Sequence, residues 1–318
     1  MRRLERLSPA APLGGLWQNA SMLCVFAALF GAASFVVPSF LTAFNMVSLA
    51  LSVSTVGMVA CTMLFCLAAG DFDLSVESVV AFSGVLAAVV INATGSVGAG
   101  IAAALLAGAL IGLANGCIIT KLKINALITT FATMQIVRGL GYLVSGGTAV
   151  GINSESFFGL GSSSFLGIPT PVWITLASFA LFGLLLNRTV YGRNALAIGG
   201  NAEAARLAGV AVDRTKITIF AVQGLMAAFA GLVLASRMTS GQPRASEGFS
   251  LDVISACVLG GVSLSGGVGT MLGTVVGVFI MGTVQNGMNL LNIPTFYQYI
   301  VRGTILLLAV LLDRLKHR

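Results

Sequence analysis

Residues 97–120 read VGAGIAAALLAGALIGLANGCIIT, an apolar run that contains no charged side chain. About 20 apolar residues are enough for an α-helix to cross the hydrocarbon core of a bilayer, so this run predicts a transmembrane helix. Similar runs recur along the chain, in which 57% of the residues are hydrophobic and 8% are charged. Because a soluble domain carries about 25% charged residues, the composition predicts an all-α, polytopic membrane bundle. It excludes a disordered chain, a secreted disulfide scaffold and a nucleic-acid-binding protein.

Apolar runs separated by charges, prolines or glycine clusters predict about ten transmembrane helices. These helices are expected over residues 20–37, 46–69, 74–93, 97–120, 125–145, 171–187, 215–236, 251–267, 270–291 and 295–312. A count of about eight is the alternative if one pair of spans is re-entrant. The chain then divides into an N-terminal segment (1–19), a transmembrane domain (20–312) and a short tail (313–318).

The positions of lysine and arginine predict the orientation of the bundle, because cytoplasmic loops carry an excess of both. If both termini are cytoplasmic, the inside segments hold Arg2, Arg3, Arg6, Lys121, Lys123, Arg188, Arg193, Arg206, Arg214, Lys216, Arg314, Lys316 and Arg318. Only Arg138, Arg237, Arg244 and Arg302 then lie in or beyond the membrane. The inverted arrangement reverses this bias, so the sequence predicts cytoplasmic N- and C-termini.

Several kinds of chemistry lack the residues that they need. The only histidine is His317, and the cysteines lie in apolar stretches without metal-ligand spacing, where they are expected to pack as small side chains. No Gly-x-x-x-x-Gly-Lys-[Ser/Thr] phosphate loop occurs in the sequence. We therefore expect no catalytic residues, no metal site and no ATP hydrolysis by this chain alone.

The loop 188–214 is the most polar stretch and is predicted to lie on the cytoplasmic side. Asn201 is expected to cap a short helix over residues 202–207, and Gly209 is expected to end it. Leu207 and the alanines of this helix are expected on its packed side. The loop therefore predicts a short amphipathic helix at the membrane face.

Asp71, Asp73 and Glu77 lie between the second and third predicted spans, and two interpretations of them are open. Gly-Asp-Phe-Asp-Leu-Ser has the form of a helix start, in which Asp73 caps the helix that follows. Alternatively, carboxylates near the membrane bind a coupling proton or sodium ion, because charge at that depth is costly and usually functional.

Arg138 and Arg302 lie within the fifth and tenth predicted spans. An unpaired arginine at the bilayer centre costs about 2.5–3.5 kcal/mol, so both side chains are expected to face protein or water. Snorkelling to the outer interface is the alternative. With Asp71, Asp73 and Asn125, these arginines are candidates for residues that line a path or hold the bundle together.

Two short motifs recur in the chain. GLANG (112–116) precedes IVRG (136–139), and GTVQNG (282–287) precedes IVRG (300–303). These motifs fall on spans four and five and again on spans nine and ten. Because an odd number of spans separates them, the two halves would run in opposite directions. We hypothesise an inverted repeat, an architecture that recurs in transporters.

Glycine recurs every fourth residue in two stretches, one within the span 97–120 and one that begins just before the span 270–291. The glycines are Gly108, Gly112, Gly116, Gly269, Gly273 and Gly277. This spacing places a smooth face on each helix, where two backbones can approach closely. We expect close helix packing at both stripes.

Five stretches resemble a known family of membrane proteins. They are MVACTMLFCLAAGDFDLSV (58–76), KLKINALITTFATMQIVRG (121–139), AIGGNAEAARLAGV (197–210), ASRMTSGQP (235–243) and DVISACVLGGVSLSGGVG (252–269). Through them the chain resembles the permease subunits of ribose, arabinose, galactose and xylose ABC importers, over nearly its whole length. The second and fourth stretches are most similar to the arabinose branch of that family.

The resemblance implies a homodimeric permease in the bacterial inner membrane that carries L-arabinose by ATP-driven alternating access. It implies two further partners: a sugar ATPase with two nucleotide-binding cassettes in one chain, which holds ATP and Mg²⁺, and a periplasmic sugar-binding protein. No cofactor is expected on this chain. Two alternatives remain open: another monosaccharide (ribose, xylose or galactose), and an ion-coupled secondary carrier that uses Asp71, Asp73 and Glu77.

The resemblance also assigns residues to two surfaces. The segment that couples to the ATPase matches the family at Gly199, Gly200, Asn201, Glu203, Ala204, Ala205, Arg206, Leu207 and Gly209. The charged residues of the outer loops are candidates for docking the binding protein, namely Glu155, Arg237, Arg244 and Glu247.

Overall fold

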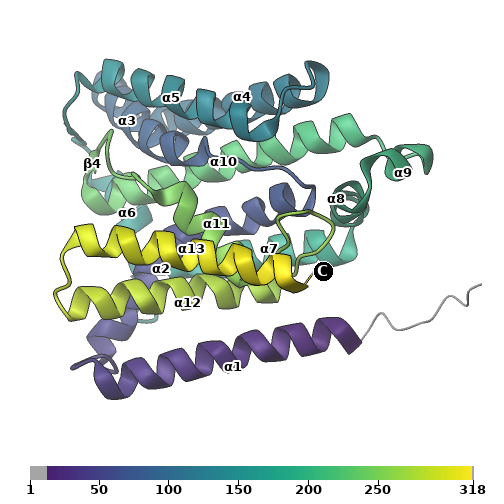
Figure 1. The fold of residues 1–318 in the computed structure, drawn as a ribbon. Coiled ribbons are helices and arrows are strands. Elements are labelled where there is room, and N and C mark those ends of the chain that lie inside the picture. Colours follow the sequence, from purple (N-terminus) through teal and green to yellow (C-terminus); the bar gives the residue numbers. More distant parts are fainter. Residues whose placement is uncertain (1–12, 317–318) are drawn as a thin grey trace, which may run out of the picture.

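The computed structural model describes residues 13–316, with side chains from 22 to 311, as a bundle of long helices (Figure 1). The helices are α1 (Leu13–Val36), α2 (Ala43–Ala68), α3 (Val76–Thr94), α4 (Val97–Lys121), α5 (Ala126–Ser145), α6 (Glu155–Ser162), α7 (Thr170–Arg188), α8 (Val190–Gly200), α9 (Ala202–Leu207), α10 (Val212–Met238), α11 (Phe249–Leu259), α12 (Met271–Leu290) and α13 (Thr295–Lys316). Four short strands are β1 (Val150–Gly151), β2 (Ser164–Phe165), β3 (Ile168–Pro169) and β4 (Ser240–Gly241). β1 pairs with β4 and β2 with β3, both antiparallel.

Within the described residues, seven helices are long and apolar enough to cross a membrane: α2, α3, α4, α5, α7, α10 and α12. Helices α1 and α13 contain 24 and 22 residues, and their described apolar stretches are Met22–Val36 and Thr295–Leu311. The helical membrane bundle is therefore confirmed. About ten complete helical spans are not, because α11 is too short to cross.

The predicted eighth span, 251–267, is wrong as a continuous helix. α11 has 11 residues, a length of about 16 Å at 1.5 Å per residue, which is roughly half of the bilayer core. Residues 260–270 continue the span without helix, and the turns at Gly261, Gly266 and Gly267 have φ values of 80°, 84° and 78°. Glycine alone adopts such angles readily, so this glycine-rich run ends the helix despite its apolar composition. We call residues 249–270 the broken span.

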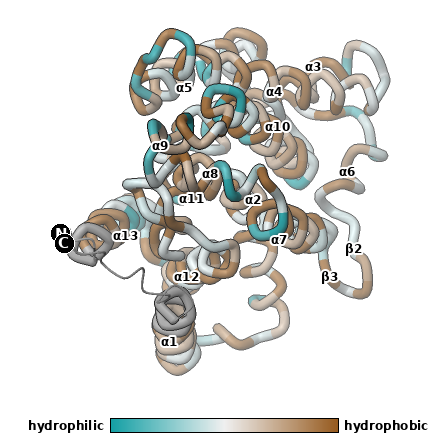
Figure 2. The backbone as a smooth tube through the Cα atoms, turned by 90° about the vertical axis from the view of Figure 1, so that its right-hand side faces the viewer, coloured by the Kyte–Doolittle hydropathy of each residue, from teal (hydrophilic) through white to brown (hydrophobic). Residues whose placement is uncertain are grey.

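The two ends of the bundle differ in character. One end, which we call the basic end, carries α8, α9 and the turn between α4 and α5 (right in Figure 1), and the described start of α1 and end of α13 lie there too. Figure 2 shows this end facing the viewer, with hydrophilic residues around α8 and α9. The opposite end carries α6, β4 with its partner β1, and the turns that join α1 to α2 and α12 to α13. The described start of α1 and the described end of α13 therefore lie on the same side as the loop 188–214, as the predicted orientation requires. Of the predicted terminal parts, residues 13–19 belong to α1 and 313–316 to α13, while residues 1–12 and 317–318 lie outside the described chain.

The expected close packing at both glycine stripes is confirmed. On α4, a Cβ atom added at Gly112 would overlap the carbonyl oxygen of Phe220 in α10, and one at Gly116 would lie 2.7 Å from the Cα of Ile217. On α12, added Cβ atoms at Gly273 and Gly277 would overlap backbone oxygens of the broken span. Both helix pairs therefore pack backbone against backbone.

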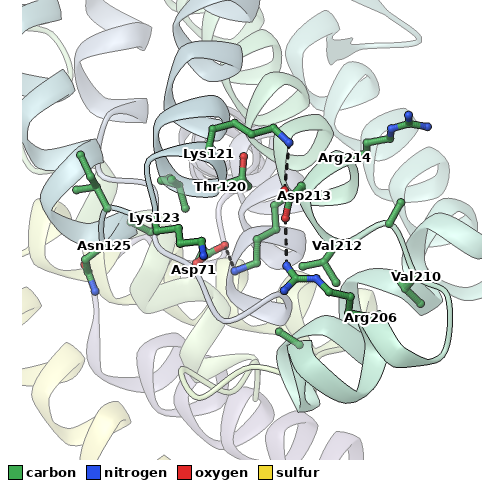
Figure 3. Close-up of a pocket in the computed structure, with 16 residues that line it drawn as sticks. Asp71, Thr120, Lys121, Lys123, Asn125, Arg206, Val210, Val212, Asp213 and Arg214 are labelled. Carbon is green, nitrogen blue, oxygen red and sulfur yellow. Dashed lines mark hydrogen bonds and ion pairs between the residues drawn. The ribbon is translucent and has the colours of Figure 1, made fainter.

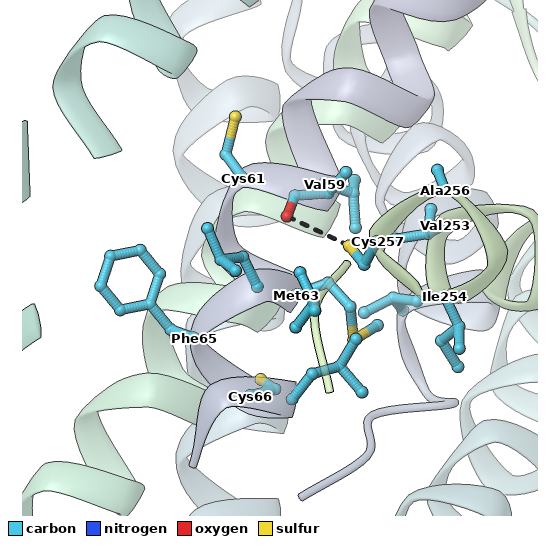
Figure 4. Close-up of a cluster of buried hydrophobic side chains, with 14 of the residues drawn as sticks. Val59, Cys61, Met63, Phe65, Cys66, Val253, Ile254, Ala256 and Cys257 are labelled. Atoms are coloured by element: carbon cyan, nitrogen blue, oxygen red, sulfur yellow. Dashed lines mark hydrogen bonds between the residues drawn. The ribbon is translucent and has the colours of Figure 1, made fainter. Parts of the chain in front are cut away.

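The centre of the bundle is formed by α2 and the elements around it. Figure 4 shows α2 side chains packed against α11, with the thiol of Cys257 lying 3.6 Å from the Ala60 carbonyl oxygen that accepts its hydrogen bond. Cys61, Cys66 and Cys257 are free and buried, which confirms the predicted packing role for these three cysteines. Cys24 is exposed and Cys117 is half-buried.

A glycine-to-alanine substitution should affect stability differently inside and outside the contact of α4 with α10. Gly112→Ala should lower the free energy of unfolding by about 1–3 kcal/mol, because the new methyl group has no room. Gly31→Ala on α1 meets no atom within 4 Å and should be neutral or stabilising by up to about 1 kcal/mol. Thermal unfolding of both variants in one detergent measures the difference. Equal melting temperatures would contradict the packing described here.

Candidate functional site

The loop 188–214 folds into α8 and α9 at the basic end. The side chain of Asn201 accepts a hydrogen bond from the Ala204 amide at 2.9 Å, and Gly209 has a φ of 89° after the helix ends. The predicted cap, short helix and terminal glycine are confirmed. Helix α8 was not predicted. Its sequence signal is Thr189, whose hydroxyl caps the helix by accepting a hydrogen bond from the Gly192 amide at 3.4 Å.

The expected packed face of α9 is wrong for Leu207, Ala202 and Ala204. Leu207 is 83% exposed, both alanines are exposed, and Ala205 is the buried residue of the helix. The prediction assumed a helix lying flat on the membrane face, whereas α9 stands out from the bundle (Figure 1). An exposed leucine beside exposed Glu203 and Arg206 is accessible to another protein.

Ion pairs connect α9 to two long helices. Arg206 lies 3.3 Å from Asp213 at the start of α10 and 3.8 Å from Glu203, and Lys121 at the end of α4 lies 3.1 Å from the same Asp213 (Figure 3). All four side chains are at least 38% exposed, so each pair contributes only about 0–1 kcal/mol. They orient α9 more than they stabilise the fold.

A cavity of about 850 Å³ lies beside these pairs (Figure 3). Five basic and two acidic side chains are among the residues that line it: Lys121, Lys123, Arg206, Arg214, Lys216, Asp71 and Asp213. Asn125 also lines the cavity, and its side chain caps α5 by accepting a hydrogen bond from the Leu127 amide at 2.9 Å. Asn125 therefore has a structural role in this fold.

The three carboxylates between the second and third spans all have partners in the protein. Asp71 lies 2.8 Å from Lys216, and Glu77 forms an ion pair with Arg138. Asp73 accepts hydrogen bonds from the amide and hydroxyl groups of Ser75, at 2.9 and 2.5 Å, at the entry to α3. The N-cap residue of α3 is Ser75, and no side chain caps this helix, so the predicted cap at Asp73 is wrong in position. Asp73 instead forms a local turn with Ser75 just before the helix, and its carboxylate is engaged there by the protein.

Both arginines of the membrane spans are paired with carboxylates. Arg138 contacts Glu77, and Arg302 lies 3.1 Å from Asp252 in the first turn of α11. The Glu77 and Asp252 side chains are 8% and 10% exposed, and both arginine side chains are 24% exposed. The expectation that both arginines face protein or water is therefore confirmed, as charge at this depth requires.

Two buried polar residues that contact candidate site residues or their neighbours were missed by sequence analysis. Asp252 is the partner of Arg302. The only feature of the sequence that points to it is its position as a single acidic residue in an apolar run. Asn115 is fully buried, donates to the Ser75 hydroxyl at 3.0 Å and accepts from the Thr133 hydroxyl at 2.6 Å. Its signal was the GLANG motif, which was interpreted only as part of a repeat.

The ion pairs occur at matching places in two sets of three helices. Glu77 and Arg138 lie on the first and third helices of the set α3–α5. Asp252 and Arg302 lie on the first and third helices of the set α11–α13. This correspondence supports the hypothesis of an inverted repeat.

Of the four charged residues considered for the outer loops, three are exposed at the opposite end: Glu155, Arg244 and Glu247. The Arg244 guanidinium lies 5.8 Å from the centre of the Tyr142 ring. Arg237 is half-buried and donates a hydrogen bond to the Leu51 carbonyl at 3.3 Å. Arg237 is therefore engaged within the bundle.

A multi-pass helical bundle with paired membrane-embedded charges and a protruding capped helix at one end has the features of a membrane transport protein. Residues 45–310 match the family described as "Branched-chain amino acid transport system / permease component", and the chain belongs to this family. It is thus the permease component of a transport system, as the resemblance predicted.

Several relatives are similar over most of their length. The chain is 62% identical to the L-arabinose transport system permease protein AraH of Escherichia coli (strain K12), over 96% of this chain and 93% of the relative. It is 55% identical to the L-arabinose ABC transporter permease protein AraH of Azospirillum brasilense, over 97% and 92%. It is 43% identical to the ribose import permease protein RbsC of Bacillus subtilis (strain 168), over 88% and 87%. No solved structure gives a significant match.

The pair formed by Asp252 and Arg302 predicts a strong energetic coupling. Arg302→Gln should lower the free energy of unfolding by about 3–5 kcal/mol, because it leaves a buried carboxylate without its partner. Asp252→Asn in the same chain should recover part of this loss. A double-mutant cycle measured by unfolding in detergent gives the coupling, with Lys121→Ala at the exposed pair as the weak control. Additive effects of Arg302→Gln and Asp252→Asn would contradict a paired arginine.

Proposed function

We propose that this chain is the permease subunit of a binding-protein-dependent ABC importer for L-arabinose, and that it works as a homodimer in the bacterial inner membrane. The observation that carries the proposal is the 62% identity with the E. coli L-arabinose permease over 96% of this chain. The relatives with ribose in their names are more distant, at 43% identity or less. This difference favours arabinose over ribose as the cargo.

The partner proteins occupy opposite ends of the bundle. A separate ATPase with two nucleotide-binding cassettes docks at the basic end on α9, where Arg206 and Leu207 are exposed. A loaded periplasmic binding protein docks at the opposite end, on Glu155, Arg244 and Glu247. The basic residues near α9 support this orientation, because such residues mark the cytoplasmic side.

Transport then proceeds by alternating access. When the cassettes close on ATP, they move α9. This helix moves as a stiff unit because Asn201 caps it and Arg206 pairs with Asp213. The movement opens a path along the dimer axis to the binding protein, which releases its sugar. Hydrolysis resets the basic end. ATP and Mg²⁺ are held by the ATPase, so this chain supplies movement and a path.

A secondary carrier is the competing function, because it would use Asp71, Asp73 and Glu77 to bind a coupling ion. Each of these carboxylates already has a partner: Lys216, Ser75 and Arg138, respectively. Among the residues described, no group of three or more His, Cys, Asp or Glu side chains could hold a metal ion. These contacts favour the ATP-driven function.

Sugar-dependent ATPase activity tests the proposal. The complex of this chain, its ATPase and its binding protein is placed in liposomes, and L-arabinose, ribose, xylose and galactose are compared. Arabinose should stimulate hydrolysis most, since the loaded binding protein triggers closure. Stimulation by another sugar would overturn the proposed cargo, and no stimulation by any sugar would overturn the importer.

Charge reversals at the two ends separate the two partners and serve as controls for each other. Arg206→Glu should weaken copurification of the ATPase, because it reverses the charge on α9 and breaks the contact with Asp213. Arg244→Glu should leave copurification intact but reduce stimulation by loaded binding protein by about tenfold. Copurification assays and stimulated hydrolysis measure the two effects. Two variants with the same defect would contradict the assignment of separate docking ends.

A further inference from the structure

The broken span contacts the proposed coupling segment through backbone atoms. The Gly267 amide donates a hydrogen bond to the Ala68 carbonyl at 2.9 Å, at the end of α2. A Cβ atom added at Gly199 of α8 would overlap both the Ala68 carbonyl oxygen and the Gly267 amide nitrogen. One added at Gly266 would lie 2.8 Å from the Gly199 Cα. Three backbones therefore meet here without intervening side chains, and we call Ala68, Gly199, Gly266 and Gly267 the glycine junction.

The other end of the broken span contacts both membrane-embedded ion pairs. The Ser250 hydroxyl donates to the Glu77 carboxylate at 3.0 Å, and Glu77 is the partner of Arg138. Two residues further along α11, Asp252 holds Arg302 at 3.1 Å. Successive residues of a helix are about 100° apart, so these two side chains leave α11 on roughly opposite sides. The first turn of α11 is thus held between the two pairs.

The helix between these contacts is tightly packed. Seven consecutive α11 residues, from Asp252 to Val258, are buried, and an added Cβ at Gly277 of α12 would overlap the Ala256 carbonyl oxygen. Close-packed protein transmits a displacement and does not absorb it. The non-helical part, 260–270, is less enclosed: Gly260, Val262 and Ser263 are buried, Ser265 and Val268 are exposed, and the other residues are half-buried.

We propose that the broken span is the mechanical link between the coupling segment and the two ion pairs. When α8 and α9 move, Gly199 displaces Gly266 and Gly267, and the packed α11 shifts with them. The shift changes the Ser250–Glu77 and Asp252–Arg302 contacts, which moves the side chains of Arg138 and Arg302. Gly267 and Ser250 are therefore positioning residues for transport. This inference rests on the proposed importer function.

Two substitutions test the link at its two ends, within the full complex of permease, ATPase and binding protein. Gly267→Ala places a methyl group 3.0 Å from the Gly200 Cα and strains a backbone with φ of 78°. Ser250→Ala removes the hydrogen bond to Glu77 and adds no atoms. Both variants should retain ATPase copurification and unstimulated hydrolysis. In both variants, sugar uptake and the stimulation of ATP hydrolysis by sugar should each fall about tenfold. A factor of this size is typical of the coupling between distant sites.

Each variant has a matched control. Gly147→Ala introduces the same strain at a φ of 79°, but its methyl group meets no atom within 4 Å. Ser178→Ala removes a hydroxyl that bonds only the Ile174 carbonyl of its own helix, at 2.8 Å. Both controls should behave as the unmodified chain. Equal losses in variants and controls would overturn the link.

The outcomes also separate this inference from the proposed function. If the unmodified complex shows no sugar-stimulated hydrolysis, the importer function fails. If the unmodified complex is stimulated and Ser250→Ala is stimulated equally, the importer stands and the link is overturned. If Gly267→Ala does not assemble, Ser250→Ala decides alone, since it adds no atoms and disturbs no backbone.

Discussion

The interior of a bilayer offers no water to hydrogen-bond with charged or backbone groups, so every such group in this bundle needs a partner from the protein. This constraint explains why Arg138 and Arg302 each contact a carboxylate, and why the non-helical part of the broken span packs its Gly267 amide against Ala68. It also places α11 between both ion pairs. The need to pair these membrane-embedded charges therefore determines the position of α11.

Hydropathy predicted most of the fold because crossing a membrane imposes a length that sequence reveals directly. The expected spans 97–120 and 125–145 agree closely with α4 (Val97–Lys121) and α5 (Ala126–Ser145). The same criterion failed at 251–267, since apolar composition does not distinguish a helix from buried glycine-rich backbone. Gly261 lies in a local turn at the end of α11, in which the Val262 amide donates to the Cys257 carbonyl. Gly266 and Gly267 pack against Gly199 and Gly200 of α8, and hydropathy does not report such contacts between distant segments.

The candidate site was predictable where its chemistry is local. The Asn201 cap joins residues three apart, so a single sequence reveals it. The partner of Arg302 lies 50 residues away, and only the packing of α11 against α13 brings Asp252 to it. Leu207 was misplaced for a related reason, because its exposure depends on how α9 projects from the bundle. Residue pairs and exposed faces required the structure, whereas the Asn201 cap and spans such as 97–120 did not.

The energy source of transport tests the central claim most directly. Uptake of labelled L-arabinose is measured in liposomes that contain the full complex, with ATP supplied on the ATPase side or with an imposed proton or sodium gradient. The account predicts uptake that requires ATP, the ATPase and the binding protein together. Gradient-driven uptake by this chain alone, without ATP, would contradict it and would return Asp71, Asp73 and Glu77 to the role of ion sites.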